Sequence, residues 1–260
     1  MNNLTSDLEL RRKFQVNEFP RSAKYDPYWV HKHEMGPNVL WFTEALCQEM
    51  ELKPRMRVLD LGCGTAMSSI FMAKEYGVQV WATDLWIQAS ENLGRICDEG
   101  VEDTVFPIHA DARQLPFADE FFDAIVSVDS YHYFGTDVHY LEFYLLKLLK
   151  RGGQIGIASP ASPTEIPRPF PEHLDDTWYW MNSVEWWKKH WERCPGLEVE
   201  MAELLHGGWE LWVRWHEFLN SFDTRNRAGE VSELADLLAD QGRYLGFVRM
   251  IGQRSEIDPQ

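Results

Sequence analysis

The chain has 260 residues, of which 45% are hydrophobic, enough for one large α/β domain with a buried core. Its net charge of −16 would repel a polyanion, so we do not expect a nucleic-acid partner. No apolar run is long enough to cross a bilayer, and residues 1–13 lack the apolar stretch of a secretory signal. The four cysteines show no CxxC spacing. We therefore expect a cytoplasmic protein without a metal site, a disulfide or a stable membrane association.

The first fifty residues predict two helices separated by an irregular arm. Residues 6–9 have the pattern of a capping box, which predicts a short helix over residues 7–13. Residues 14–33 carry two prolines among aromatic residues and predict irregular structure. A proline at position 37 and the apolar spacing after it predict a helix over residues 37–50.

From residue 58 the pattern alternates between short apolar strands and helices. The predicted strands cover 58–61, 78–82, 104–109, 123–128 and 154–158, and the predicted helices cover 68–76, 87–99 and 138–150. Such alternation predicts a parallel sheet with helices on both faces. Pro107 removes a hydrogen-bond donor from its strand, so that strand is expected at an edge of the sheet.

After residue 160 a proline-rich loop leads into segments rich in tryptophan. Predicted here are helices over 183–193, 208–222 and 231–241, and strands over 197–202 and 245–252. The tryptophans follow helical spacing, which usually indicates core packing or a subunit interface, so a homo-oligomer is one arrangement that would use them.

A glycine turn at residues 58–66, VLDLGCGTA, is the most informative segment. A buried strand runs into the turn, and a helix follows it. Gly62 and Gly64 permit positive φ and let the backbone approach a ligand without a Cβ in the way. Dinucleotide enzymes share this pattern, but Met67 stands where their third glycine would be, so a pyrophosphate-binding turn fits poorly.

Three aspartates lie at the carboxyl ends of consecutive predicted strands. Asp60 is in the strand before the turn, Asp84 ends the second strand, and Asp111 follows the third. These strand ends converge on one crevice in a doubly wound sheet, where Asp84 is placed to accept hydrogen bonds from ribose hydroxyls. An acidic crevice suits a ligand with hydroxyls, amines or a sulfonium and no phosphate. Any one of the aspartates alone also fits a cap or turn role.

Five motifs in order resemble the class I S-adenosylmethionine-dependent methyltransferases over about residues 56–159: VLDLGCGTA, VWATDL, HADARQLPF, FDAIVSVDSYHYF and LLKLLKRGGQIGI. The resemblance is to the small-molecule type, related to UbiE-like, cyclopropane-synthase-like, sugar and phosphoethanolamine methyltransferases. It implies a Rossmann-like α/β fold with a seven-stranded, mostly parallel sheet, helices on both faces and a C-terminal antiparallel hairpin formed by 197–202 and 245–252. Ala66 stands where many members carry glycine.

The resemblance implies S-adenosyl-L-methionine as the cofactor. Asp60, Gly62 and Gly64 would cradle its methionine part. Asp84 would hold the ribose, with Leu85 against the adenine. The expected reaction is direct displacement of the methyl group onto a nitrogen, oxygen or sulfur of a small-molecule acceptor.

Further roles follow on the adenine and acceptor sides. Asp111 would reach the adenine amino group, and Ala112 would supply backbone contacts. Asp129, just after the fourth strand, would border the methyl-transfer site. A hydroxyl or ammonium acceptor must lose a proton, and His132 in the same segment is the first candidate for the base that accepts it. Alternatively, His132 packs or hydrogen-bonds beneath the sheet and has no catalytic role.

Aromatic residues of the N-terminal arm predict a lid. Tyr25, with Tyr28, Trp29 and His31, would close over the site, and an aromatic wall would suit a cationic acceptor. Ordinary packing of the arm explains the same pattern. The HxH pair of His31 with residue 33 fits solvated side chains better than a metal site.

We predict one domain over residues 1–260. It would consist of an N-terminal lid over 1–36, a cofactor-binding core over 37–159, and helical cap insertions with the final strands over 160–260. Three alternatives stay open: a lipid or quinone methyltransferase, a nicotinamide-dependent oxidoreductase, and a non-catalytic cofactor-binding protein.

Overall fold

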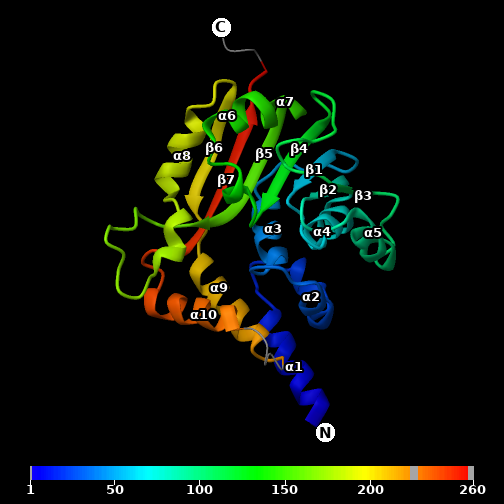
Figure 1. Cartoon of the computed structure of the whole chain (residues 1–260). Helices are drawn as coiled ribbons and strands as arrows, with labels where there is room; N and C mark the ends of the chain where they lie inside the picture. The colour runs from blue at the N-terminus through cyan, green and yellow to red at the C-terminus, as the bar shows by residue number, and fades with distance from the viewer. Residues whose placement is uncertain (1, 223–227, 257–260) are drawn as a thin grey trace.

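The computed structural model describes residues 2–222 and 228–256, and a twisted seven-stranded sheet forms its centre (Figure 1). The strand order is β3-β2-β1-β4-β5-β7-β6. The strands are β1 (Arg57–Leu61), β2 (Gln79–Asp84), β3 (Val105–His109), β4 (Phe122–Val128), β5 (Leu149–Ala161), β6 (Leu197–Leu204) and β7 (Gly246–Arg254).

Strand pairing confirms the predicted Rossmann-like fold. β1 pairs in parallel with β2 and β4, β2 with β3, and β4 with β5, whereas β7 is antiparallel to both β5 and β6. β3 lies at one edge of the sheet, as Pro107 predicts, and Pro107 is opposite Ala82 of β2.

Helices surround the sheet. They are α1 (Asn2–Phe14), η1 (Ser22–Lys24), α2 (Pro27–His33), α3 (Val39–Cys47), α4 (Met67–Tyr76), α5 (Ala89–Asp98), η2 (Tyr131–Tyr133), α6 (Val138–Tyr140), η3 (Leu141–Leu145), α7 (Leu146–Leu148), η4 (Asp176–Trp180), α8 (Val184–Glu192), α9 (Gly208–Leu219) and α10 (Ala228–Asp240).

Successive side chains of the central strands point into two separate apolar layers. Val58 of β1 packs with α3, α4 and α9, whereas its neighbour Leu59 packs on the other face with α8 and the helix over residues 138–148. This alternation follows from the pleat of a strand, and both faces are apolar because helices cover both. Trp187 and Trp215 lie in these layers, each 1% exposed, so the tryptophan-rich helices pack into the core.

The structure corrects three boundaries at the N-terminus. α1 begins at Asn2, so Ser6 lies inside the helix and the predicted capping box is wrong. The arm predicted as irregular contains α2, because Asp26 caps it by accepting a hydrogen bond from the Tyr28 N–H and Pro27 provides its first turn. Asn38 caps α3 in the same way, so that helix begins at Val39.

Later in the chain, the predicted helix over 138–150 ends at Leu148, and β5 begins at the next residue. Leu149 is fully buried opposite Phe122 of β4, which favours the strand there. Pro160 belongs to β5 and is opposite Phe247, although the sequence predicts a loop from that residue.

Helices α1, α2, α9 and α10 lie together at the end of the sheet where β4 terminates (Figure 1). They stand at the carboxyl ends of the parallel strands, where ligands bind in open α/β sheets. None of the helices in the described ranges is long and apolar enough to cross a membrane.

A buried carboxylate fastens the N-terminal arm to α3. Glu44 is fully buried, and its Oε1 accepts a hydrogen bond from the Arg21 N–H at 3.0 Å. Its Oε2 accepts from both the N–H and the hydroxyl of Ser22, each at 2.6 Å. Three donors of the arm therefore depend on this one side chain.

Replacing Glu44 with Ala should lower the free energy of unfolding by about 3 kcal/mol, because three buried donors lose their acceptor. Urea denaturation measures this change. The control is Glu51→Ala, whose side chain is 77% exposed and should change stability by less than about 0.5 kcal/mol. Equal stability of the two variants would contradict this account of the arm.

Candidate active site

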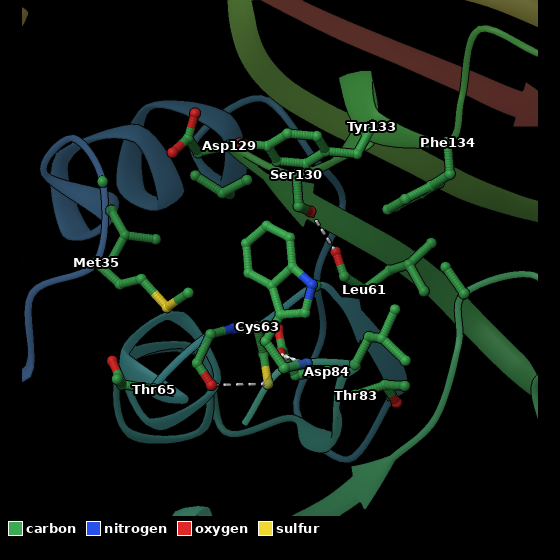
Figure 2. Close-up of a pocket in the computed structure, with 18 of the residues that line it drawn as sticks. Met35, Leu61, Cys63, Thr65, Thr83, Asp84, Asp129, Ser130, Tyr133 and Phe134 are labelled. Carbon is green, nitrogen blue, oxygen red and sulfur yellow. Dashed lines mark hydrogen bonds between the residues drawn. The ribbon is translucent and has the colours of Figure 1, made fainter. Parts of the chain in front are cut away.

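A cavity opens where β1, β2 and β4 end, and Figure 2 shows side chains from each of these strand ends around it. Of the sequence-predicted site residues, the structure brings seven to its walls: Gly62, Gly64, Asp84, Leu85, Asp111, Ala112 and Asp129. Asp60, Tyr25 and His132 are not among the lining residues.

The glycine turn needs residues without a side chain. Gly62 has φ +76°, and its N–H donates to the Thr83 carbonyl at 2.8 Å. A Cβ on Gly62 would collide with the side chain of Ser130, at the end of β4. Gly64 has φ +52°, and Ala66 is also left-handed at φ +63° where α4 begins. Glycine adopts this conformation at no steric cost, whereas Ala66 adopts it with a side chain.

Asp84 connects β2 to the turn. Its Oδ2 accepts a hydrogen bond from the Gly64 N–H at 2.9 Å, and its Oδ1 accepts from the N–H groups of Trp86 and Ile87 at 2.7 and 2.9 Å. Each carboxylate oxygen has further lone-pair capacity, and the side chain borders the cavity. Asp84 therefore holds the turn in shape while it offers acceptors to a ligand.

Asp60 lies beneath the turn, fully buried. Its Oδ2 accepts hydrogen bonds from the hydroxyls of Ser68 and Ser69 at 2.6 and 2.5 Å, and Oδ1 has no hydrogen-bond partner among the described residues. Burial raises the pKa of Asp60 to about 6, against the lowering effect of the two serines. The side chain thus braces α4 against β1 from behind the cavity wall.

The opposite wall carries an ion pair, between Asp111 and Arg113, that was not predicted from the sequence. Both oxygens of Asp111 accept hydrogen bonds from the Arg113 side chain, at 3.0 and 2.9 Å, and these bonds lower the pKa of Asp111. Arg113 lines the cavity beside Ala112, and Leu85 faces the same space. The sequence does indicate this ion pair, because Arg113 follows Asp111 by two residues, a spacing that allows the two side chains to meet.

Asp129 follows β4 in a left-handed conformation, with φ +54°, and its N–H donates to the Ala158 carbonyl at 2.8 Å. Its carboxylate packs so closely on Gly36 that a Cβ there would collide with Oδ2. Burial raises the pKa of Asp129 well above its usual value, and the charge of Glu233 adds to the effect. Figure 2 places this carboxylate beside the ring of Tyr133.

His132 lies behind that wall and is 8% exposed. Its Nδ1 is 2.9 Å from the Ser159 hydroxyl, and its ring stacks on Trp180 with a centroid distance of 4.6 Å. Burial lowers the pKa of His132 to about 4, so the ring is neutral at physiological pH. It adjoins Tyr133, which does line the cavity.

Tyr25 is not among the residues that line the cavity. Its ring packs on Phe71 of α4, at 5.6 Å, and on Trp29, at 5.6 Å. This contact holds the start of the arm on the side of α4, whereas the N-terminus of α4 faces the cavity. Met35 and Gly36 are the arm residues that line the cavity, and their only local signal was their place just before a helix.

Comparison with known proteins shows which families and folds the chain is similar to. Residues 58–153 match the family model described as a methyltransferase domain. The chain is 31% identical over 152 residues to the methyltransferase GfsG of Streptomyces halstedii, a match that covers 55% of this chain and 54% of that protein. The chain therefore spans about half the length of this curated relative.

Solved structures share the fold. One is a phosphoethanolamine N-methyltransferase 2 of Haemonchus contortus in complex with S-adenosyl-L-methionine, with a TM-score of 0.72 and 19% identity over 95% of this chain and 60% of that one. Another is the [4+2]-cyclase SpnF, with a TM-score of 0.68 and 17% identity over 86% and 84% of the two chains. The domain match and the ordered motifs support a class I S-adenosylmethionine-dependent methyltransferase with S-adenosyl-L-methionine as its cofactor, and the solved structures share its fold.

Proposed function

We propose that the chain transfers the methyl group of S-adenosyl-L-methionine to a nitrogen, oxygen or sulfur of a small-molecule acceptor. One observation carries the proposal: the left-handed glycine turn, held by Asp84, opens into a cavity that continues to the half-buried Asp129. A cofactor placed along the turn would direct its methyl group toward that carboxylate.

The cofactor would lie across three strand ends. Its methionine part would follow the backbone of Gly62 and Gly64, and Asp84 would accept hydrogen bonds from the ribose hydroxyls. The adenine would lie near Leu85, with Asp111 accepting from its amino group. In this arrangement Asp60 acts indirectly, because it fixes α4 through Ser68 and Ser69 and so shapes the turn.

Direct displacement needs an aligned nucleophile and a dry site. The acceptor atom attacks the methyl carbon, the carbon–sulfonium bond breaks, and S-adenosylhomocysteine leaves. A hydroxyl or ammonium acceptor gives its proton to a base, a step that typically contributes about 10²- to 10⁴-fold. The geometry favours Asp129 over His132 as this base, because Asp129 lines the cavity and burial raises its pKa, which makes the carboxylate more basic.

The fold also supports a second candidate function. The cyclase SpnF has this architecture, so the fold alone does not require methyl transfer. A cofactor-binding protein without methyl transfer would bind S-adenosylmethionine and release no S-adenosylhomocysteine with any acceptor.

A screen of metabolites for S-adenosylhomocysteine release tests the proposal. We expect turnover with at least one amine, hydroxyl or thiol compound, and a rate that falls as pH decreases, because protonated Asp129 cannot accept a proton. Cofactor binding without release across an acceptor set that spans all three classes would favour the second candidate.

Replacing Asp84 with Ala should weaken binding of S-adenosylhomocysteine at least about tenfold, because the ribose loses a charged acceptor and the turn loses its support. Titration calorimetry gives the dissociation constant. Asp98→Ala, an exposed change at the end of α5, is the control and should bind like the wild type. Unchanged affinity in a folded Asp84→Ala variant would refute the ribose assignment.

Asp129 should distinguish sinefungin from S-adenosylhomocysteine, since sinefungin carries an amine in the place of the methyl group that S-adenosyl-L-methionine donates. We expect sinefungin to bind at least about tenfold more tightly, through a charge-assisted hydrogen bond. Asp129→Asn should abolish this preference, as competition binding would show. Asp111→Asn should weaken both ligands alike and keep their ratio. A preference retained in Asp129→Asn would place the carboxylate away from the methyl position.

A further inference from the structure

Residues 33–38 cross the cavity between α2 and α3 and are hereafter called the strap. It is fixed at three points. The Thr65 hydroxyl donates to the His33 carbonyl at 2.5 Å, which ties the strap to the glycine turn. The indole N–H of Trp215 donates to the Gly36 carbonyl at 2.9 Å. At the far end, Asn38 caps α3.

The middle of the strap covers the turn. The Sδ atom of Met35 lies 3.1 Å from the position that a Cβ on Gly64 would occupy. Figure 2 shows the Met35 side chain extending over the cavity toward Cys63. Gly36 has φ +75° and packs on the Asp129 carboxylate. A ligand seated along the glycine turn is therefore enclosed between the turn and the strap.

Trp215 is well placed to fix the strap. It is 1% exposed, stacks on Phe218 with a centroid distance of 5.0 Å, and meets Trp41 edge-on at 6.1 Å. A ring held on two sides presents its single N–H in one direction. Because Trp215 lies on α9, this bond joins the helices after residue 160 to the segment that covers the cofactor site.

We propose that Trp215 is a positioning residue for the cofactor: its indole N–H holds Gly36, and with it Met35, over the glycine turn and so slows cofactor release. This inference rests on the cofactor site proposed above. The chemistry of the ligand is unchanged, so the effect should appear mainly in the dissociation rate.

The test is Trp215→Phe, which keeps an aromatic ring and removes the N–H. Surface plasmon resonance would measure the dissociation rate of S-adenosylhomocysteine. We expect the rate to rise about 3- to 10-fold, as expected for the loss of one hydrogen bond. Amide hydrogen exchange in residues 34–36 should become faster in the same variant, which a loss of general packing elsewhere would not predict.

Trp41→Phe is the matched control. Trp41 lies in the same aromatic cluster and is fully buried, and its Nε1 has no hydrogen-bond partner within the described part of the chain. Its dissociation rate should stay within about twofold of the wild type. Equal rates in Trp215→Phe, Trp41→Phe and the wild type would overturn the proposal.

If Trp215→Phe does not fold, a second variant tests the same proposal. Gly36→Ala places a Cβ against Asp129 and should displace the strap, with the same increase in dissociation rate. Gly100→Ala carries comparable backbone strain, with φ +64° and no neighbouring atom within 4 Å, and should leave the rate unchanged. Unaltered release from folded Gly36→Ala would also overturn the proposal. Absence of any ligand binding by the wild type would instead refute the cofactor site itself.

Discussion

The site depends on a backbone that turns left-handed three times within five residues. Gly62, Gly64 and Ala66 all have positive φ, and the turn they form is held from β2 by the Thr83 carbonyl and the Asp84 carboxylate. A strand that met its helix through ordinary residues would fill this space with side chains. The turn instead leaves a hollow at the strand ends, where backbone groups and acceptor oxygens face a ligand.

The rest of the fold surrounds this hollow. Because β1, β2 and β4 are parallel, residues far apart in the chain bring Asp84 and Asp129 to the same end of the sheet. Met35 and Gly36 of the strap line the cavity, and the bond from Trp215 to Gly36 links the last third of the chain to the first. Cofactor and acceptor sides are consequently built from one connected set of contacts.

Local patterns predicted the sheet, its edge strand at Pro107, and the glycine turn, because period-two apolar runs and special φ values are properties of neighbouring residues. The direction of Asp60 was also within reach of the sequence. Strand alternation places it on the face of Val58, toward α4, and not at the strand end. The position of Tyr25 could not be predicted from the sequence, because it depends on which side of α4 the arm packs against. Met35 and Gly36 were missed for the same reason.

The central claim is that the glycine turn and Asp84 hold the adenosyl cofactor. A crystal structure with S-adenosylhomocysteine tests it most directly. The account predicts ribose hydroxyls within hydrogen-bonding distance of the Asp84 carboxylate, with the sulfur facing Asp129. An adenosyl group bound elsewhere on the molecule, with the turn left empty, would contradict it.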